Sequence, residues 1–179
     1  MCLYINDYIH DELMCYRNYT KLPKPFVAQK DIHCLKVLET DGFGNRWFTP
    51  FMYSFIHFNN GVATLEVKKS RKKFPFYFNY SDSCSYYISE GVHSLVRKND
   101  IYICADRHYF DAVIPKGSML YFGEDGDIVS DKLLIFGIPA YLEYKEKNDV
   151  FDIVEAMKGY VSDYELARIL NKSNIVKTY

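Results

Sequence analysis

Short apolar runs separated by turn residues fill the middle of this chain and limit the folds open to it. Residues 31–38 are largely apolar, and residues 62–67 alternate between two faces as half-buried strands do. The turns between such runs are rich in glycine and asparagine, as in Asn59-Asn60-Gly61, which tolerates positive φ. This pattern predicts a twisted, mainly antiparallel sheet of about six to eight strands.

Helical spacing of apolar side chains occurs only towards the two ends. Residues 3–17 carry it, and Pro23 then begins an extended link. It returns from residue 149, and residues 162–165 match a Ser-x-x-Glu capping box that opens another helix. The predicted fold class is therefore α+β, with an N-terminal helix and a C-terminal pair of short helices beside the sheet.

We expect three segments along the chain. Residues 1–22 form a helix packed on the body, residues 23–148 a β-rich core domain, and residues 149–179 a C-terminal helical cap. Such a helical pair can also be a DNA-reading helix-turn-helix. Its second helix offers only Arg168 and Lys172, so a packed cap is favoured.

Charge and cysteine usage restrict the binding partners and the cellular compartment of the chain. The formal net charge is -1, so no global field draws the chain to nucleic acid or membrane. The five cysteines are odd in number and scattered, without a Cys-x-x-Cys pair or a recognisable secretory leader. No apolar run approaches the ~20 residues that span a bilayer. We therefore expect reduced thiols and a soluble protein of the bacterial host cytosol.

One local exception to the charge balance is a basic run. Residues 68–73 hold five positive charges in six positions, and alternating aromatic residues follow. Basic residues beside aromatics can bind single-stranded nucleic acid. A solvated hairpin loop followed by a strand explains the same residues, and we favour it.

Recognised catalytic and metal-binding patterns are missing from the sequence. The five histidines include no His-x-x-x-His, and neither a Gly-x-Ser-x-Gly elbow nor a Gly-x-x-x-x-Gly-Lys loop occurs. We predict no catalytic residues, no metal site and no cofactor. The 17 tyrosines and 13 phenylalanines instead favour strands and leave many phenol hydroxyls to line a pocket or an interface.

Three polar clusters between apolar runs are the candidate site. They are residues 90–94, 114–118 and 127–131, and the predicted ligand-binding side chains in them are His93, Ser94, Lys116, Ser118, Ser130 and Asp131. A histidine after Gly91 can hydrogen-bond a ribose hydroxyl or a phosphate. It can equally be a sheet histidine satisfied by backbone groups. Lys116 before Gly117 can meet an anion, or simply occupy a tight turn. We expect the three clusters to converge on one rim.

The order Gly-Val-His-Ser, then Val-Ile-Pro-Lys-Gly-Ser-x-x-Tyr-x-Gly, then Ile-Val-Ser-Asp-Lys-x-x-Ile resembles a family of small uncharacterised proteins of phages and mobile elements of gut Bacteroidales. The resemblance covers about residues 27–137, with residues 27–32 as its opening. It implies a setting more than a mechanism.

The chain is also similar, more weakly, to the ADP-ribosyltransferase fold. In that comparison Lys36 stands where the first strand often has arginine or histidine, and residues 91–94 resemble the middle element. Asp127 or Asp131 would be the acid. The chain departs from that fold in lacking a first-strand arginine, a Ser-Thr-Ser and a Glu-x-Glu. The similarity adds Lys36 to the candidate ligand-binding residues.

These observations support three hypotheses on function. The first is a non-enzymatic phage or mobile-element accessory protein that binds a host protein or other macromolecule, or a small nucleotide, in a setting of counter-defence. The second is an ADP-ribosyltransferase-like enzyme acting on a nicotinamide dinucleotide, and the third a structural or virion-associated assembly protein. No membrane partner is expected, nucleic acid only at the basic run of residues 68–73, and a homo-oligomer is left open.

Overall fold

The computed structural model of the chain describes residues 3–4, 25–41, 46–49, 55–67, 77–80, 86–96, 98, 107–123 and 126–157. Its strands are β1 (Leu3–Tyr4), β2 (Phe26–Val27), β3 (Asp31–Thr40), β4 (Trp47–Phe48), β5 (Phe55–Ile56), β6 (Val62–Glu66), β7 (Tyr77–Tyr80), β8 (Tyr86–Glu90), β9 (Val92–Leu95), β10 (Arg107–Ile114), β11 (Met119–Phe122), β12 (Asp127–Ser130), β13 (Lys132–Phe136) and β14 (Val150–Phe151). The helices are α1 (Ile138–Lys147) and α2 (Ile153–Met157).

One 11-stranded sheet forms the body, in the order β2-β11-β12-β9-β3-β10-β13-β6. β4 and β14 pair with β3 outside this path, and β5 pairs with β4. Every strand pair is antiparallel except β14 with β3. A separate sheet has the order β1-β8-β7. The predicted antiparallel character is confirmed, but the sheet is larger than expected.

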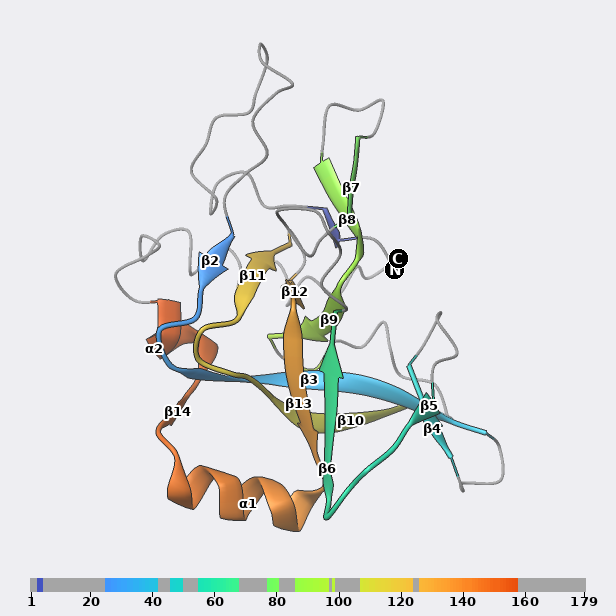
Figure 1. The fold of residues 1–179 in the computed structure, drawn as a ribbon, viewed down its shortest axis with the longest axis vertical. Helices are drawn as coiled ribbons and strands as arrows, with labels where there is room; N and C mark the ends of the chain where they lie inside the picture. Colours follow the sequence, from blue (N-terminus) through green and yellow to red (C-terminus); the bar gives the residue numbers. More distant parts are fainter. Residues whose placement is uncertain are drawn as a thin grey trace, which may run out of the picture.

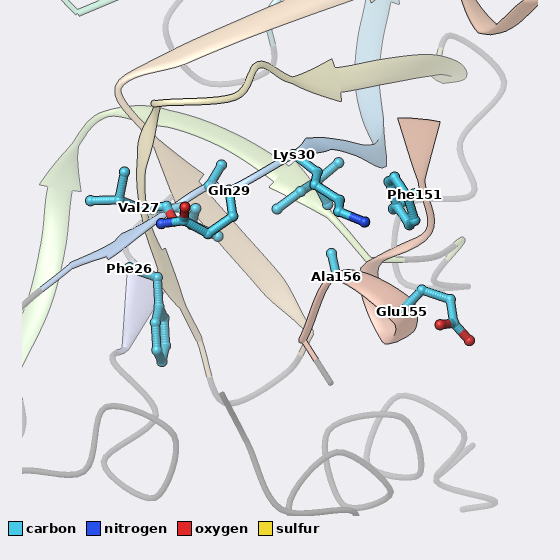
Figure 2. A pocket seen from close by; sticks show the side chains of 10 residues that line it. Phe26, Val27, Gln29, Lys30, Phe151, Glu155 and Ala156 are labelled. Atoms are coloured by element: carbon cyan, nitrogen blue, oxygen red, sulfur yellow. The ribbon is translucent and has the colours of Figure 1, made fainter. Parts of the chain in front are cut away.

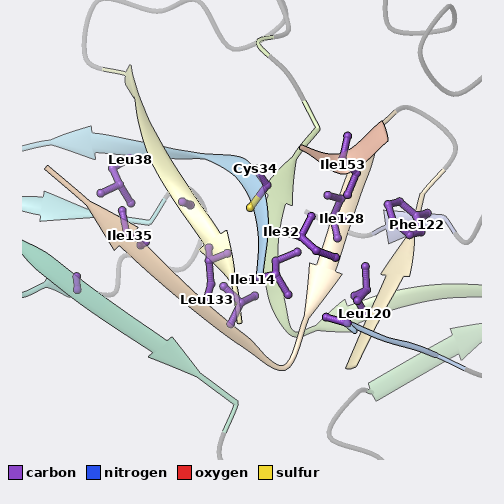
Figure 3. Packing of buried hydrophobic residues seen from close by; sticks show 14 of the residues in the cluster. Ile32, Cys34, Leu38, Ile114, Leu120, Phe122, Ile128, Leu133, Ile135 and Ile153 are labelled. Carbon is purple, nitrogen blue, oxygen red and sulfur yellow. The ribbon is translucent and has the colours of Figure 1, made fainter. Parts of the chain in front are cut away.

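The core lies inside the curve of the large sheet. β3 runs across the direction of β12 and β6 in Figure 1, so strands from distant parts of the order face one another. Figure 3 shows side chains from β3, β10, β11, β12 and β13 converging, with Ile153 of α2 among them. Alternation along β3 brings Ile32, Cys34 and Leu38 to this side, each at most 3% exposed. Burying each such aliphatic side chain contributes about 1.5–3 kcal/mol.

Helix α1 covers the outer side of β10 and β13. Gly137 precedes it and Pro139 lies in its first turn, where a missing N–H costs nothing. Buried Tyr141 packs with Phe136 and Val113. The sequence did not predict this helix, because Ile138 and Leu142 are 75% and 56% exposed and blur its apolar stripe.

The predicted α+β class is wrong, because the described chain is mostly β with two small helices. Leu3–Tyr4 is not the start of a helix but the strand β1, paired with β8. Val150–Phe151 extends along β3 as β14 before α2 begins. Pairing with an existing strand satisfies backbone groups, and this outweighs a weak helical spacing of apolar residues. The rest of the predicted N-terminal helix (residues 5–17) and the second C-terminal helix lie outside the described residues.

Neither described helix has the length and apolar character needed to cross a membrane. The basic run at residues 68–73 lies outside the described part of the chain.

The predicted turn at Asn59-Asn60-Gly61 is confirmed. Asn59 and Val62 form a bridge, and Asn60 and Gly61 have φ of 51° and 77°. The Gly61 carbonyl accepts a hydrogen bond from the Gly137 N–H at 2.8 Å, which ties this turn to the start of α1. A Cβ on Gly61 would lie 2.9 Å from the Cβ of Ala140.

Gly61→Ala is therefore expected to lower the free energy of unfolding by about 2–4 kcal/mol, from left-handed backbone strain plus overpacking against α1. Urea unfolding measures it. Gly117→Ala is the matched control, because Gly117 also has positive φ (86°) but no atom within 4 Å of an added Cβ. It should lose only about 1–2 kcal/mol. Equal losses in the two variants would contradict the proposed contact with α1.

Candidate functional site

Residues 115–118 form the connection between β10 and β11, whereas residues 127–130 form strand β12 and Asp131 the bend that follows it. Lys116 is exposed, and its backbone N–H donates to Asp31 Oδ1 at 2.8 Å. Asp131 accepts from the Met119 N–H at 3.0 Å, and the buried Ser130 hydroxyl donates to the Lys132 carbonyl at 2.9 Å. These bonds hold the β10–β11 and β12–β13 connections together.

Ser118, in the first of these turns, is also buried, and its N–H donates to the Pro115 carbonyl at 3.0 Å. Residues 90–94 and 127–131 lie side by side, because β9 pairs with β12 and sets His93 opposite Val129. The convergence of all three clusters on one rim stays a prediction. Lys116 lies in an exposed turn, whereas Ser94, Ser118 and Ser130 are buried.

The structure does bring Lys36, His93 and Ser94 together, at the junction of β3 and β9. These strands share a single paired position, Leu35 with Leu95. One residue further along β3, Lys36 is 7% exposed and its Nζ donates to the His93 carbonyl at 2.5 Å. The lysine side chain thus bridges the two strands where their backbone ladder stops.

Burial controls the charge of this group of side chains. It lowers the pKa of Lys36 to about 8, against a small opposing effect of Cys34. It lowers the pKa of His93 to about 3, and the charge of Lys36 adds to this. It raises the pKa of the Cys34 thiol to about 12. At neutral pH the imidazole and the thiol are therefore uncharged.

Several polar atoms at this junction have no partner. Both ring nitrogens of His93 and the hydroxyl of Ser94 are buried and have no hydrogen-bond partner among the described residues. Ser94 is near enough to Cys34 to lower the thiol pKa, against the larger effect of burial. Unsatisfied buried groups of this kind are rare in native proteins, and a bound water, an ion or a functional role accounts for them.

A second group of polar side chains, which the sequence did not single out, lies on the opposite face of β3. His33 Nε2 is 2.8 Å from Asp111 Oδ1, and the His33 ring lies 5.2 Å from that of Tyr141. The Tyr144 hydroxyl donates to Asp31 Oδ2 at 2.7 Å. Burial and Asp31 raise the pKa of Tyr144 to about 12, so it remains a donor. These contacts fasten α1 to the sheet.

A cavity of about 320 Å³ opens beside the β2–β3 turn, β14 and α2. Its lining residues are Phe26, Val27, Ala28, Gln29, Lys30, Ile32, Leu120, Phe151, Glu155 and Ala156. None of the predicted ligand-binding residues is among them. Figure 2 shows Lys30 extended towards Phe151, and the Lys30 Nζ lies 3.7 Å from the centroid of that ring.

Two features of the sequence point to this cavity. Phe26 and Val27 follow the proline-rich link, and Lys30 belongs to the opening of the phage-type resemblance. The helical spacing from residue 149 predicts a helix at Phe151, so it does not place this ring next to β3.

Comparison of the chain with protein-family models, curated proteins and solved structures finds no match.

Lys36→Met tests the buried amine through the pH dependence of stability. Between pH 8 and 10.5 the unfolded chain keeps a proton on Lys36 that the folded chain releases. The stability of the wild type should therefore rise with pH in this interval, by up to about 3 kcal/mol, relative to the variant. Urea unfolding at pH 7 and pH 10 measures it, and all other titrating groups cancel in the difference. Parallel pH profiles would contradict a buried, perturbed lysine.

His93→Gln tests the buried imidazole at acid pH. In the unfolded chain His93 binds a proton near pH 6.5, whereas in the folded chain it does so only near pH 3. The wild type should thus lose up to about 5 kcal/mol more than the variant as the pH falls through this interval. Thermal unfolding at pH 6.5 and pH 4 reports the difference. A histidine open to solvent would give the same acid sensitivity in both proteins.

Proposed function

We propose that this chain is a non-enzymatic binding protein whose ligand is a small nucleotide held in the cavity between the β2–β3 turn, β14 and α2. The observation that carries the proposal is the pairing of a cation with an aromatic ring at one cavity. Lys30 Nζ lies 3.7 Å from the Phe151 ring centroid, and both side chains line the space.

The chemistry of the lining fits a molecule with a flat apolar part and an anionic part. Phe26 and Phe151 offer ring faces or edges to a base. Lys30 is an exposed ammonium that can meet a phosphate, and Gln29 is an exposed amide that can reach a base edge. Pockets that take small ligands combine mostly apolar walls with a few polar groups in this way.

The acidic member of the lining, Glu155, lies on the side of Phe151 and apart from the Phe26 ring and the Gln29 amide. In Figure 2 the Glu155 carboxylate is on the far side of the cavity from Phe26 and Gln29. A ligand that places its base at Phe26 and its phosphate at Lys30 would avoid this carboxylate. The volume is at the small end of ligand pockets, which favours a mononucleotide. A nicotinamide dinucleotide would extend beyond it, so the transferase hypothesis gains no support.

The proposed setting is a phage or mobile-element accessory protein in a bacterial cytosol. The resemblance that suggests it begins at residues 27–32, and five of these six residues line the cavity. In counter-defence, such a protein would remove a nucleotide signal or occupy a host macromolecule.

Isothermal titration calorimetry with a panel of nucleoside monophosphates tests the proposal. The wild type should bind at least one of them. Lys30→Met and Phe151→Leu should each weaken that binding by about tenfold, corresponding to roughly 1–2 kcal/mol for a lost cation–π and phosphate contact. Lys145→Met, an exposed change in the last turn of α1, is the control and should bind as the wild type does.

Two results would overturn the proposal. One is the absence of heat with every nucleotide in the panel, which would favour a host protein or an assembly role. The other is nucleotide binding that Lys30→Met and Phe151→Leu leave unchanged.

A further inference from the structure

The Lys36 ammonium is a buried cation without a counter-charge among the described residues. Its Nζ has three donors, and the structure gives one of them a partner, the His93 carbonyl. The described salt bridges involve His33, Arg107 and Lys132, and none involves Lys36. A charge taken out of water without an opposite charge is costly, so such a group either loses its proton or acquires a counter-ion.

A second, independent observation lies next to this cation. Ser94 is 3% exposed, and its hydroxyl has no hydrogen-bond partner within the described part of the chain, the Cys34 thiol being the side chain close enough to be affected by it. The one paired position that joins β3 and β9, Leu35 with Leu95, is adjacent in sequence to both Lys36 and Ser94. Alternation along β9 turns Ser94 to the core side together with Val92, and alternation along β3 turns Lys36 to the side of Cys34.

From these two observations we infer that Lys36 and Ser94 form an internal binding site for a small monovalent anion, at the junction of β3 and β9. The unused donors of the Lys36 ammonium and the Ser94 hydroxyl would bind it. His93 contributes its carbonyl, which accepts from the Lys36 ammonium, whereas strand alternation turns its imidazole to the face of β9 opposite Ser94.

The surroundings decide the class of anion. One lysine balances one charge, and Cys34 and His93 are the described titratable groups beside it, both uncharged at pH 7. Across the strand pair, β10 places the apolar Phe110 next to Lys36. A weakly hydrated monovalent anion such as chloride, bromide or nitrate fits this low-polarity site, whereas a phosphate dianion would bring an uncompensated charge.

This inference does not depend on the proposed nucleotide site. Neither Lys36 nor Ser94 lines the cavity. The anion would act as a structural ligand that joins β9 to β3 where they share one paired position.

Thermal unfolding at pH 7 and constant ionic strength tests the site, with sodium gluconate replaced stepwise by sodium chloride, bromide or nitrate. A ligand that binds only the folded state raises Tm with its concentration. For the wild type we expect about 3–5 °C for each tenfold increase above Kd. Lys36→Met and Ser94→Ala should remove this dependence, and Lys145→Met should retain it.

Crystals of the wild type soaked in bromide give a second measurement that does not require the variants to fold. The expected result is an anomalous bromide peak within contact distance of Lys36 Nζ and Ser94 Oγ. Bromide bound only at the surface, or an anion dependence of Tm that is the same in the wild type and Lys36→Met, would overturn the inference.

Discussion

The pairing of β3 with β10 is the interaction on which the rest of the molecule depends. Eight consecutive residue pairs join the two strands, from Arg107 with Glu39 to Ile114 with Ile32. β3 also pairs with β9, β4 and β14. With β10, four strands therefore take their position from it. An ion pair closes the far end of the ladder, with Arg107 Nε 2.6 Å from Glu39 Oε1. Both side chains are largely buried there, so water screens this pair less than an exposed one.

The two faces of β3 are put to different uses because strand geometry separates them. Its core face carries Ile32, Cys34 and Leu38, which pack with the opposite strands of the curved sheet. Its outer face carries Asp31 and His33, whose hydrogen bonds reach α1 and β10. Lys36 breaks this division, because its position in the alternation places an amine on the core face. Burial lowers the pKa of this amine and of the His93 imidazole and raises that of the Cys34 thiol. The charge of Lys36 adds to the shift at His93 and opposes the one at Cys34.

How far the sequence predicts this structure can be argued from particular residues. Asn60-Gly61 identified a turn because only a few residue types accept positive φ, and the apolar run at residues 31–38 identified β3 for a similarly local reason. The error at Leu3–Tyr4 and the missed helix α1 have another origin. Both depend on which strand or side chain is available to pair with, and that information is not local.

The candidate site shows the same limit. The sequence points to His93 and Ser94 through a polar cluster after Gly91 and to Lys36 through the weaker similarity to the ADP-ribosyltransferase fold. They meet because β3 and β9 are joined at Leu35 and Leu95, next to Lys36 and Ser94. Lys116 and Asp131 were chosen by the same criteria, and they stabilise connections instead. The residue types near a turn therefore identify polar side chains. Only the strand register decides whether such a side chain meets other side chains or hydrogen-bonds to the backbone of a turn.

The cavity and the buried lysine are linked by the strand that they share. Ile32 lines the cavity, and Cys34 and Lys36 are the next two residues on the same face of β3. A close-packed core transmits displacement along such a face, because its side chains have little free volume to absorb it. A ligand that presses on Ile32 would thus act on the environment of Lys36, and an anion that fixes Lys36 would in turn hold the wall of the cavity. Binding of the proposed nucleotide and of the proposed anion would be coupled to the extent that each ligand changes the position of β3. Thermodynamic linkage would make the effect of each ligand on the affinity for the other equal.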